Sequence, residues 1–412
     1  MTSYSDSSVA ASSRPLTRYT PGPLRPAPEP PRPPRARRLR RVLRWTGLGL
    51  LAALGVFAVT PLGRYLAQAA WAEAEILMLR RPIVEVVRDP ATSPEVREKL
   101  RLVLQARAFA ADSLRLRARE SFTAYSDIER DTLVLVLSGA YKDRLEAKTW
   151  WFPIVGSVPY KGFFDFERAW RAAEQLEREG FDVHVRRASA FSTLGWFNDP
   201  LLSTTLKADS ADLVDTVIHE LTHNTFYEPG QAAFNESFAT FVGARGAERF
   251  FLARGDSASA AKVVARWSDQ KVLGVFWMHL AQTLDSAFKA HPDAHVERLR
   301  ARDVIYRAAR MELVFGLGPR LRTVGPRALE RMRLDNATLI ARRLYASDLE
   351  LFDRVYERED RDLDRAVHRI LEIAKDQRDP FEALREWLEP PMAAWEGIEE
   401  DSTTAAPDST GN

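Results

Sequence analysis

The chain has 412 residues, a formal net charge of +2 and no cysteine, and 45% of its residues are hydrophobic. So small a charge gives no reason to expect nucleic-acid binding. The absence of cysteine excludes disulfides, cysteine nucleophiles and thiolate zinc ligands, so stability must come from an apolar core. About 330 ordered residues can bury such a core, as one large domain or two packed lobes.

The N-terminal part predicts a membrane attachment. Residues 1–44 are rich in proline and arginine and are expected to be a disordered cytoplasmic segment. The uncharged run over 45–62 has the length of one membrane span. Because the arginines precede it and only Arg64 follows closely, we expect a signal anchor in the inner membrane, with residues 63–395 facing the periplasm. The alternative is a cleaved signal peptide with its best site at 67–69.

The next elements predict a helical segment followed by strands. Ser93 is a good N-cap for the helix expected over 93–117. A later change to β-like apolar spacing predicts a small mixed sheet. The expected helices cover 65–79, 93–117 and 166–179, and the expected strands cover 132–137 and 181–185, with an aromatic edge strand or loop at 150–160.

The sequence after residue 247 has helical spacing almost to residue 395. The last residues, 396–412, are polar and are expected to be disordered. We therefore expect an α+β fold that is predominantly helical, with the small sheet preceding the central helix. The helices expected in this half cover 258–290, 296–315, 326–353 and 361–375.

A metal-binding motif lies in the middle of the chain, where residues 219–223 are His-Glu-Leu-Thr-His. Residues four apart on a helix share a face, so His219 and His223 can bind one metal ion while Glu220 lies beside it as a general base. Pro229 and Gly230 predict a turn that lets a second helix return Glu236 as the third ligand. Two histidines and one carboxylate leave a position for water, as catalytic zinc requires. The alternative is a buried helix with hydrogen-bonded histidines.

Other residues near the motif are weaker candidates. Asp215, one turn before His219, could orient an imidazole ring, or it could cap or solvate the helix. Trp196, Asn198 and Asp199 lie in a segment that could hold an extended substrate by main-chain hydrogen bonds, or that could only pack. The remaining histidines at 279, 291, 295 and 368 have no ligand-like spacing.

Further motifs lie outside the metal-binding residues, at 65–69, 152–156, 159–164, 192–202, 234–241 and 334–337, together with Tyr345. With these motifs the chain resembles a family of predicted zinc aminopeptidases of Gram-negative bacteria, related in motif to the gluzincins. The resemblance covers residues 65–387. It implies a zincin-like fold and an exported or membrane-attached metallopeptidase in which His219, His223 and Glu236 bind zinc and Glu220 is the base.

The resemblance also raises two points about single residues. Relatives often carry a lipid-modified cysteine just before the motif at 65–69, and this chain has none, so we expect the apolar helix to provide the anchor. Gluzincins usually supply one further donor to the oxyanion, and Tyr345 is the candidate here. The alternative is a tyrosine that only packs.

The predicted function is that of a membrane-anchored zinc metallopeptidase, with aminopeptidase activity favoured, Zn²⁺ as cofactor and a peptide as substrate. The alternatives are a noncatalytic zinc-stabilised interaction protein tethered to the membrane, a zinc endopeptidase, and a hydrolase of a non-peptide amide. Glu220 favours catalysis, because a purely structural metal needs no base. An aminopeptidase also needs a carboxylate for the substrate ammonium, and Asp165, Asp199 and Glu228 are available without one being singled out. The oligomeric state is left open.

Overall fold

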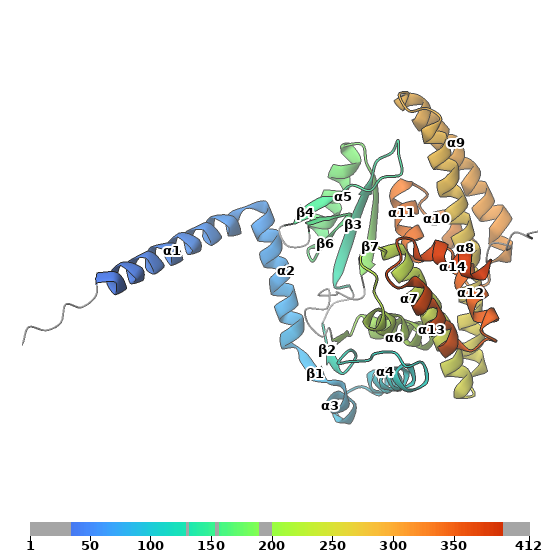
Figure 1. Cartoon of the computed structure of the whole chain (residues 1–412), viewed down its shortest axis with the longest axis horizontal. Coiled ribbons are helices and arrows are strands. Elements are labelled where there is room, and N and C mark those ends of the chain that lie inside the picture. The colour runs from blue at the N-terminus through green and yellow to red at the C-terminus, as the bar shows by residue number, and fades with distance from the viewer. Residues whose placement is uncertain (1–33, 129–131, 153–155, 189–199, 390–412) are drawn as a thin grey trace, which may run out of the picture. The chain divides into compact units, whose positions relative to one another are not determined.

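The chain is described here from a computed structural model, which covers residues 34–128, 132–152, 156–188 and 200–389. It divides into two compact units, Met1–Tyr65 and Leu66–Asn412 (Figure 1). The predicted substrate contacts Trp196, Asn198 and Asp199 lie outside the described residues, as do both ends of the chain that were predicted to be disordered.

The first unit contains α1 (Pro34–Val59), and α2 (Pro61–Met78) begins within it. The arginine cluster lies inside α1, so its predicted disorder is wrong; arginine favours helix, and Pro34 suits a first turn. The apolar run that follows is divided at Thr60, whose hydroxyl donates to Phe57 and accepts from the amide of Gly63. In the described part of the chain no helix combines the length and the apolar character that a membrane crossing requires. The single span expected over 45–62 is therefore not supported.

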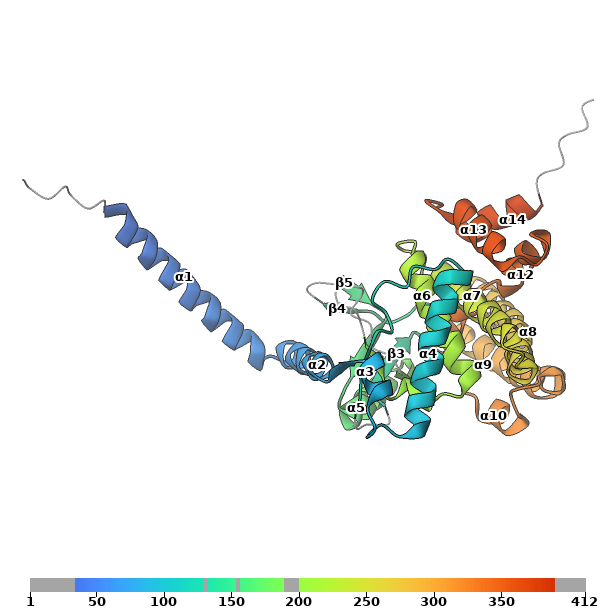
Figure 2. The ribbon, with the colours of Figure 1, turned by 90° about the horizontal axis from the view of Figure 1, so that it is seen from below.

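In the second unit α2 leads into β1 (Arg80–Pro82), α3 (Ile83–Arg88) and α4 (Pro94–Ser113). Ser93 caps α4 as predicted, because its hydroxyl accepts a hydrogen bond from the amide of Val96. The buried face of α4 then packs against the central helix of the domain (Figure 2).

In the described residues the strands form three small sheets instead of the single sheet expected. The first is mixed, with the order β1, β2 (Ala124–Ser126), β8 (Leu201–Leu202). The second is antiparallel, with the order β6 (Tyr160–Phe163), β3 (Val134–Ala140), β7 (Asp182–Ala188). The third pairs β4 (Trp150–Phe152) with β5 (Gly156–Val158).

The second sheet has β7 at its edge and carries α5 (Phe166–Arg178) on one face. Val183 on β7 and Leu137 on β3 pack together with Ala173 and Leu176 of α5. Because side chains alternate along a strand, the neighbouring residues of β7 point to the opposite face. That face meets a helix from the C-terminal half of the chain.

Three long helices form the centre of the second unit: α6 (Ser210–Thr225), α7 (Ala232–Ala253) and α8 (Ser257–Lys289). The short 3₁₀ turn η1 (Thr205–Lys207) precedes α6. Phe234, Phe238 and Phe241 of α7 are fully buried and pack around the ring of Phe352, with Phe241 stacked on it. These rings form the middle of the main core, and the fold class predicted from the sequence, predominantly helical α+β, is confirmed.

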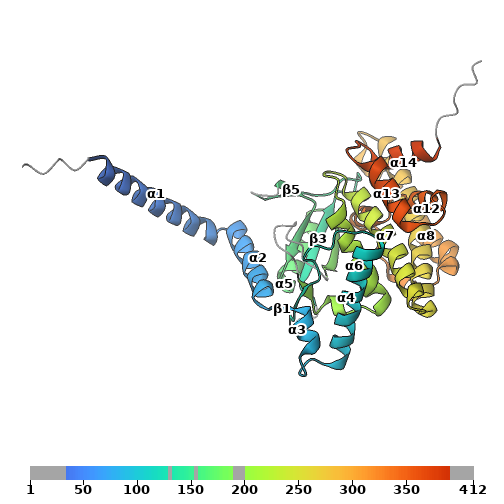
Figure 3. The same cartoon turned by 60° about the horizontal axis from the view of Figure 1, so that its bottom comes forward.

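The C-terminal half differs from the prediction in its helix boundaries. The helix α9 (His295–Met311) continues as a π-helical segment, η2 (Glu312–Leu317), and a 3₁₀ turn, η3 (Gly318–Arg320). The helix predicted over 326–353 is three helices, α10 (Pro326–Arg331), α11 (Asn336–Tyr345) and α12 (Leu349–Arg358). The long prediction failed because Asp335 caps a new helix, and Asp348 has a left-handed backbone. The last helices, α13 (Leu363–Ala374) and α14 (Pro380–Leu388), pack with α12 (Figure 3).

Candidate metal centre

The motif predicted to bind metal lies on α6, which begins and ends at clear local signals. Asp209 caps its N-terminus by accepting from the amides of Ala211 and Asp212. Leu213, Val214, Val217, Ile218 and Leu221 are all fully buried. This apolar side fixes the rotation of α6, and His219, Glu220 and His223 stay partly exposed.

The connection from α6 to α7 is held by one buried amide. The side chain of Asn235 accepts from the amide of Glu228 at 2.9 Å and donates to the carbonyl of Glu228 at 2.8 Å. Gly230 adopts a positive φ of 82°, which closes the turn between the helices. Since Asn235 precedes Glu236 directly, this amide clip fixes where the third predicted ligand leaves the turn. Sequence analysis quoted Asn235 only as part of a motif and missed this role.

The two helices approach closely because α7 has small residues where it faces α6. A Cβ atom on Gly243 would come within 2.3 Å of Oδ1 of Asp215, and one on Gly246 within 2.9 Å of Cγ2 of Ile218. Neither space could take a side chain without movement. The glycines therefore set the separation of α6 and α7, and they are a second feature that the sequence analysis missed.

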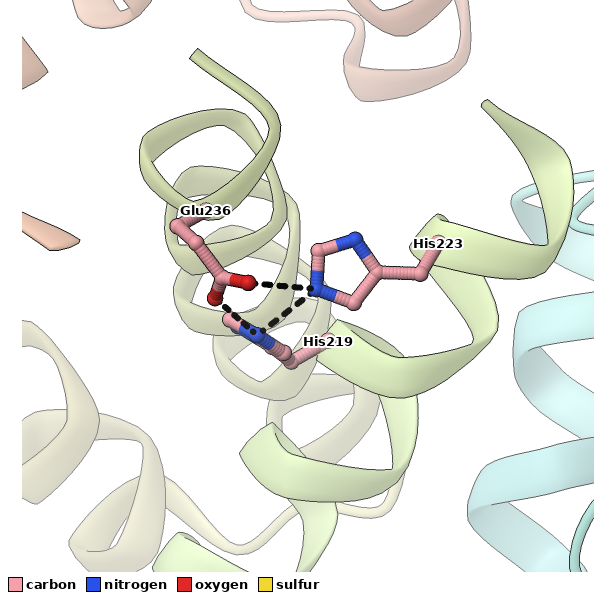
Figure 4. Close-up of side chains that lie close together, drawn as sticks. All are labelled: His219, His223 and Glu236. Atoms are coloured by element: carbon pink, nitrogen blue, oxygen red, sulfur yellow. Dashed lines mark hydrogen bonds and ion pairs between the residues drawn. The ribbon is translucent and has the colours of Figure 1, made fainter. Parts of the chain in front are cut away.

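At this separation the two imidazole rings and the carboxylate converge (Figure 4). Nε2 of His219 lies 3.2 Å from Nε2 of His223, and the carboxylate oxygens of Glu236 lie 3.4 Å from the first nitrogen and 3.7 Å from the second. Ligand atoms about 2.0–2.1 Å from a tetrahedral ion lie about 3.3 Å apart, so the three atoms are spaced as such an ion requires. These residues could hold a metal ion.

The electrostatics of the cluster favour a charged carboxylate. Burial raises the pKa of Glu236, but hydrogen bonds from His219 and His223 outweigh burial and hold this pKa at about 2. Burial also opposes protonation of His219, yet the neighbouring carboxylates raise its pKa. Nδ1 of His223 is buried and has no hydrogen-bond partner in the part of the chain that the structure describes. Two imidazoles and a carboxylate brought together in this way are a donor set suited to a divalent cation.

Glu220, the predicted base, lies beside this cluster and is partly exposed. The charge of Glu220 contributes to raising the pKa of both His219 and Tyr345. Within the described ranges no hydrogen bond or ion pair engages its carboxylate. It is therefore available to exchange a proton with a molecule bound at the cluster.

Asp215 lies one turn before His219 and is enclosed against Gly243 of α7. Burial raises its pKa to about 6, against the opposing charges of His219 and Arg266. It does not cap the helix, because Asp209 does. Of the roles considered from the sequence, its place agrees best with supporting His219.

Tyr345 ends α11 and lies next to the cluster. The amide of Ser347, two residues on, donates to the hydroxyl of Ser237, which follows Glu236 directly. Burial and the charge of Glu236 raise the pKa of Tyr345, although 39% of its surface is exposed. The structure thus places Tyr345 close enough to Glu236 and Glu220 to feel their charges, with its side chain partly exposed.

The remaining candidates are engaged elsewhere or were not foreseen. Asp165 caps α5 by accepting from the amide of Arg168, and Oε2 of Glu228 accepts from the amide of Asp376. Tyr227, which sequence analysis did not single out, lies with its ring centroid 6.4 Å from that of His223 and is 59% exposed. Only its nearness to the histidine motif could have signalled it.

Comparison with known protein families supports the resemblance. Residues 64–383 match the family model described as "Putative aminopeptidase". The chain belongs to this family. No curated protein and no solved structure matches the chain. The zincin-like fold therefore stays a prediction, while membership of this family suggests peptidase activity.

Proposed function

We propose that the protein is a zinc metallopeptidase whose metal ion is held by His219, His223 and Glu236. The single observation that carries the proposal is the convergence of these three donors, within 3.2–3.7 Å of one another, beside the carboxylate of Glu220, which has no partner among the described residues. A structural zinc site would use four protein ligands, whereas three leave a position open.

The chemistry divides between the ion and the side chains. A zinc ion at this site would lower the pKa of a water molecule towards neutrality and polarise the carbonyl of a peptide bond. Glu220 takes the proton of the attacking water and delivers it to the leaving amine, so the C–N bond is replaced by an acid and an amine. Asp215 supports His219 from the side of α6 that faces Gly243.

Tyr345 is the proposed donor to the carbonyl oxygen as negative charge develops there. Because burial raises the pKa of this tyrosine, the hydroxyl keeps its proton at neutral pH and can donate a hydrogen bond. Its position at the end of α11 depends on the bond between Ser347 and Ser237.

The proposal is tested with the full-length protein and its Glu220→Gln variant. Elemental analysis should find about one zinc per chain in both proteins, since Glu220 is not a ligand. Turnover of a mixed peptide library should fall by about a hundredfold to ten-thousandfold in the variant. A wild type that binds no zinc, or a variant that is as active as the wild type, would refute the proposal.

Peptides with free and blocked N-termini address the finer activity. The family description leads us to expect that only peptides with a free amine are cut. Equal cleavage of blocked peptides would leave a zinc peptidase but would remove the aminopeptidase assignment.

A further inference from the structure

Two arginines that form no ion pair within the described residues lie near the proposed metal site. Arg186 is on the edge strand β7 and Arg342 is on α11, and both are exposed. In the described part of the chain neither side chain makes a hydrogen bond or an ion pair with a carboxylate. By contrast, nearby Arg333 is paired with Asp335 and Glu177.

The strand register places Arg186 on the face of β7 that meets α11. Arg186 is opposite Val136 and His184 is opposite Ser138, while Val185 is opposite Leu137, which packs on α5. Since side chains alternate, His184 and Arg186 share the face away from α5. Nδ1 of His184 lies 3.4 Å from the hydroxyl of Thr338, and this contact sets the register of α11 against β7.

The helical period places Arg342 on the same side of α11. Thr338, Arg342 and Tyr345 are four and three residues apart and therefore follow one face of the helix. This face begins at the contact with His184 and ends beside Glu236. Arg343 instead follows Leu339, which packs in the core with α8, and lies on another side.

The electrostatic neighbourhood agrees with this placement. Burial is the main cause that lowers the pKa of His184. The positive charges of Arg342 and Arg186 lower it further. Arg186 also acts on Tyr345. Although Arg342 is exposed, desolvation by nearby protein atoms lowers its pKa, and no carboxylate of the described residues offsets this effect. The positive charges thus extend from the centre of α11 to the edge of the metal cluster.

A positive pair in this position is suited to an anionic part of the substrate. A carboxylate is planar and accepts two hydrogen bonds from a guanidinium, which makes arginine its preferred partner. Arg342 lies three residues, or about 4.5 Å of helix rise, from Tyr345. That rise is close to one residue of an extended peptide, about 3.3 Å, so the anion would lie one or two residues from the reacting carbonyl.

We propose that Arg186 and Arg342 form a subsite that binds a carboxylate of the peptide substrate. This inference rests on the proposed peptidase function and names its substrate class: peptides whose C-terminal carboxylate, or an acidic side chain, lies one or two residues from the cleaved bond. Peptides with a neutral or basic residue in that position should be poor substrates.

The test compares four versions of one short peptide. These are the free acid, the C-terminal amide, the amide with Glu at the second position after the cleaved bond, and the amide with Gln there. Binding is measured by calorimetry with the metal-free full-length protein, and KM and kcat are measured with the zinc-loaded protein. Preference for the free acid identifies the C-terminal carboxylate as the source, and preference for Glu over Gln identifies the side chain.

Arg186→Gln and Arg342→Gln should each weaken binding of the preferred peptide by about tenfold or more, raise KM and leave kcat nearly unchanged. Arg342→Lys should retain part of the preference. The matched control is Arg187→Gln, since Arg187 is on the same strand but faces the other way, and it should behave as the wild type. Thermal unfolding of each variant verifies that it is folded.

The outcomes separate this inference from the proposed function. Equal binding and equal KM for all four peptides would overturn the carboxylate subsite, while their hydrolysis would leave the peptidase intact. Arginine-dependent binding of the acidic peptide without any hydrolysis would support the subsite and count against the peptidase. If Arg187→Gln reduces the preference as much as the other two variants, the subsite is also refuted.

Discussion

Two groups of buried polar residues, one around Asn336 and one around His219, differ in how they use their hydrogen bonds. The side chain of Asn336 is fully buried and has partners for both its polar atoms. Its oxygen accepts from the hydroxyl of Tyr306 at 2.7 Å, and its nitrogen donates to the carbonyl of Tyr141 at 2.7 Å and to two neighbouring carbonyls. The backbone amide of Asn336 donates to the carboxylate of Asp182 at 2.9 Å.

The metal centre leaves such groups open. Within the described residues Nδ1 of His223 has no partner and the carboxylate of Glu220 is unpaired. The closed group joins β7, α9 and α11 and holds them in place, whereas the open group can accept an ion and a substrate. This difference indicates that the Asn336 group is a scaffold, which positions Tyr345 and Arg342, and it agrees with our proposal that the chemistry takes place at the histidine motif.

The largest effect is expected from removing a proposed metal ligand. We expect Glu236→Gln to lose zinc and to lower kcat/KM by about a thousandfold or more, because the ion supplies several kcal/mol of transition-state stabilisation. In the wild type, zinc should raise the melting temperature of the metal-free protein; in the variant it should not.

The control is Glu228→Gln, which changes a carboxylate in the same inter-helix turn outside the cluster. Its zinc content and activity should match those of the wild type. Full zinc occupancy in Glu236→Gln would contradict the ligand assignment.

Removing the scaffold residue should affect stability instead of metal binding. We expect Asn336→Ala to lower the free energy of unfolding by about 3 kcal/mol, since several buried groups lose their partner. Chemical denaturation measures this change. The control Asn224→Ala removes the hydrogen bond that Asn224 donates to the hydroxyl of Ser121, and it should cost about 1 kcal/mol. Equal losses for the two variants would show that the Asn336 group is not a special scaffold.

Tyr345 lies between the Asn336 group and the histidine motif, and its substitution shows whether it contributes to catalysis or only to packing. We expect Tyr345→Phe to lower kcat about a hundredfold without loss of zinc or stability, because only the hydroxyl donor is removed. Tyr227→Phe, at the other side of His223, should change kcat little. An unchanged kcat in Tyr345→Phe would mean that this tyrosine only packs.

The smallest expected effect concerns a carboxylate near the scaffold group. Burial raises the pKa of Asp143, but hydrogen bonds from Arg298 at 2.9 Å and His295 at 3.0 Å outweigh it and hold the pKa at about 2. A lowered native pKa stabilises the fold above the ordinary value of 3.8, and this stabilisation is lost as pH falls from 3.8 towards 2.

Asp143→Asn should therefore cost about 1 kcal/mol at pH 7, and the difference from the wild type should shrink below pH 4. Unfolding curves at pH 7, 5 and 3 measure it. A difference that does not change with pH would contradict the assigned pKa.

The sequence was sufficient to predict that His219, His223 and Glu236 converge, because the signal is local. His219 and His223 share a helical face by spacing alone, and the turn at Gly230 was visible as a helix stop. The strand at Val183 and the cap at Ser93 were also predictable from alternation and residue type. These predictions needed no knowledge of tertiary contacts.

The predictions that failed concern features that depend on contacts between residues far apart in the sequence. The close approach at Gly243 depends on Asp215 of another helix, and the start of α11 depends on Asp182, far away in the sequence. Apolar spacing therefore predicted one helix where three exist. The single helix predicted over 45–62 is not found for a local reason, because Thr60 divides this apolar run between two helices.

The amide clip of Asn235 has a consequence for how the protein would acquire its ion. Because the clip closes the connection between α6 and α7 without using any ligand atom, it would hold Glu236 near the two histidines with or without the proposed cation. Loading then costs little ordering entropy, and a chelator should strip the ion from a protein that stays folded. Exchange of the cation becomes a local event at the surface of a rigid helix pair, separate from folding.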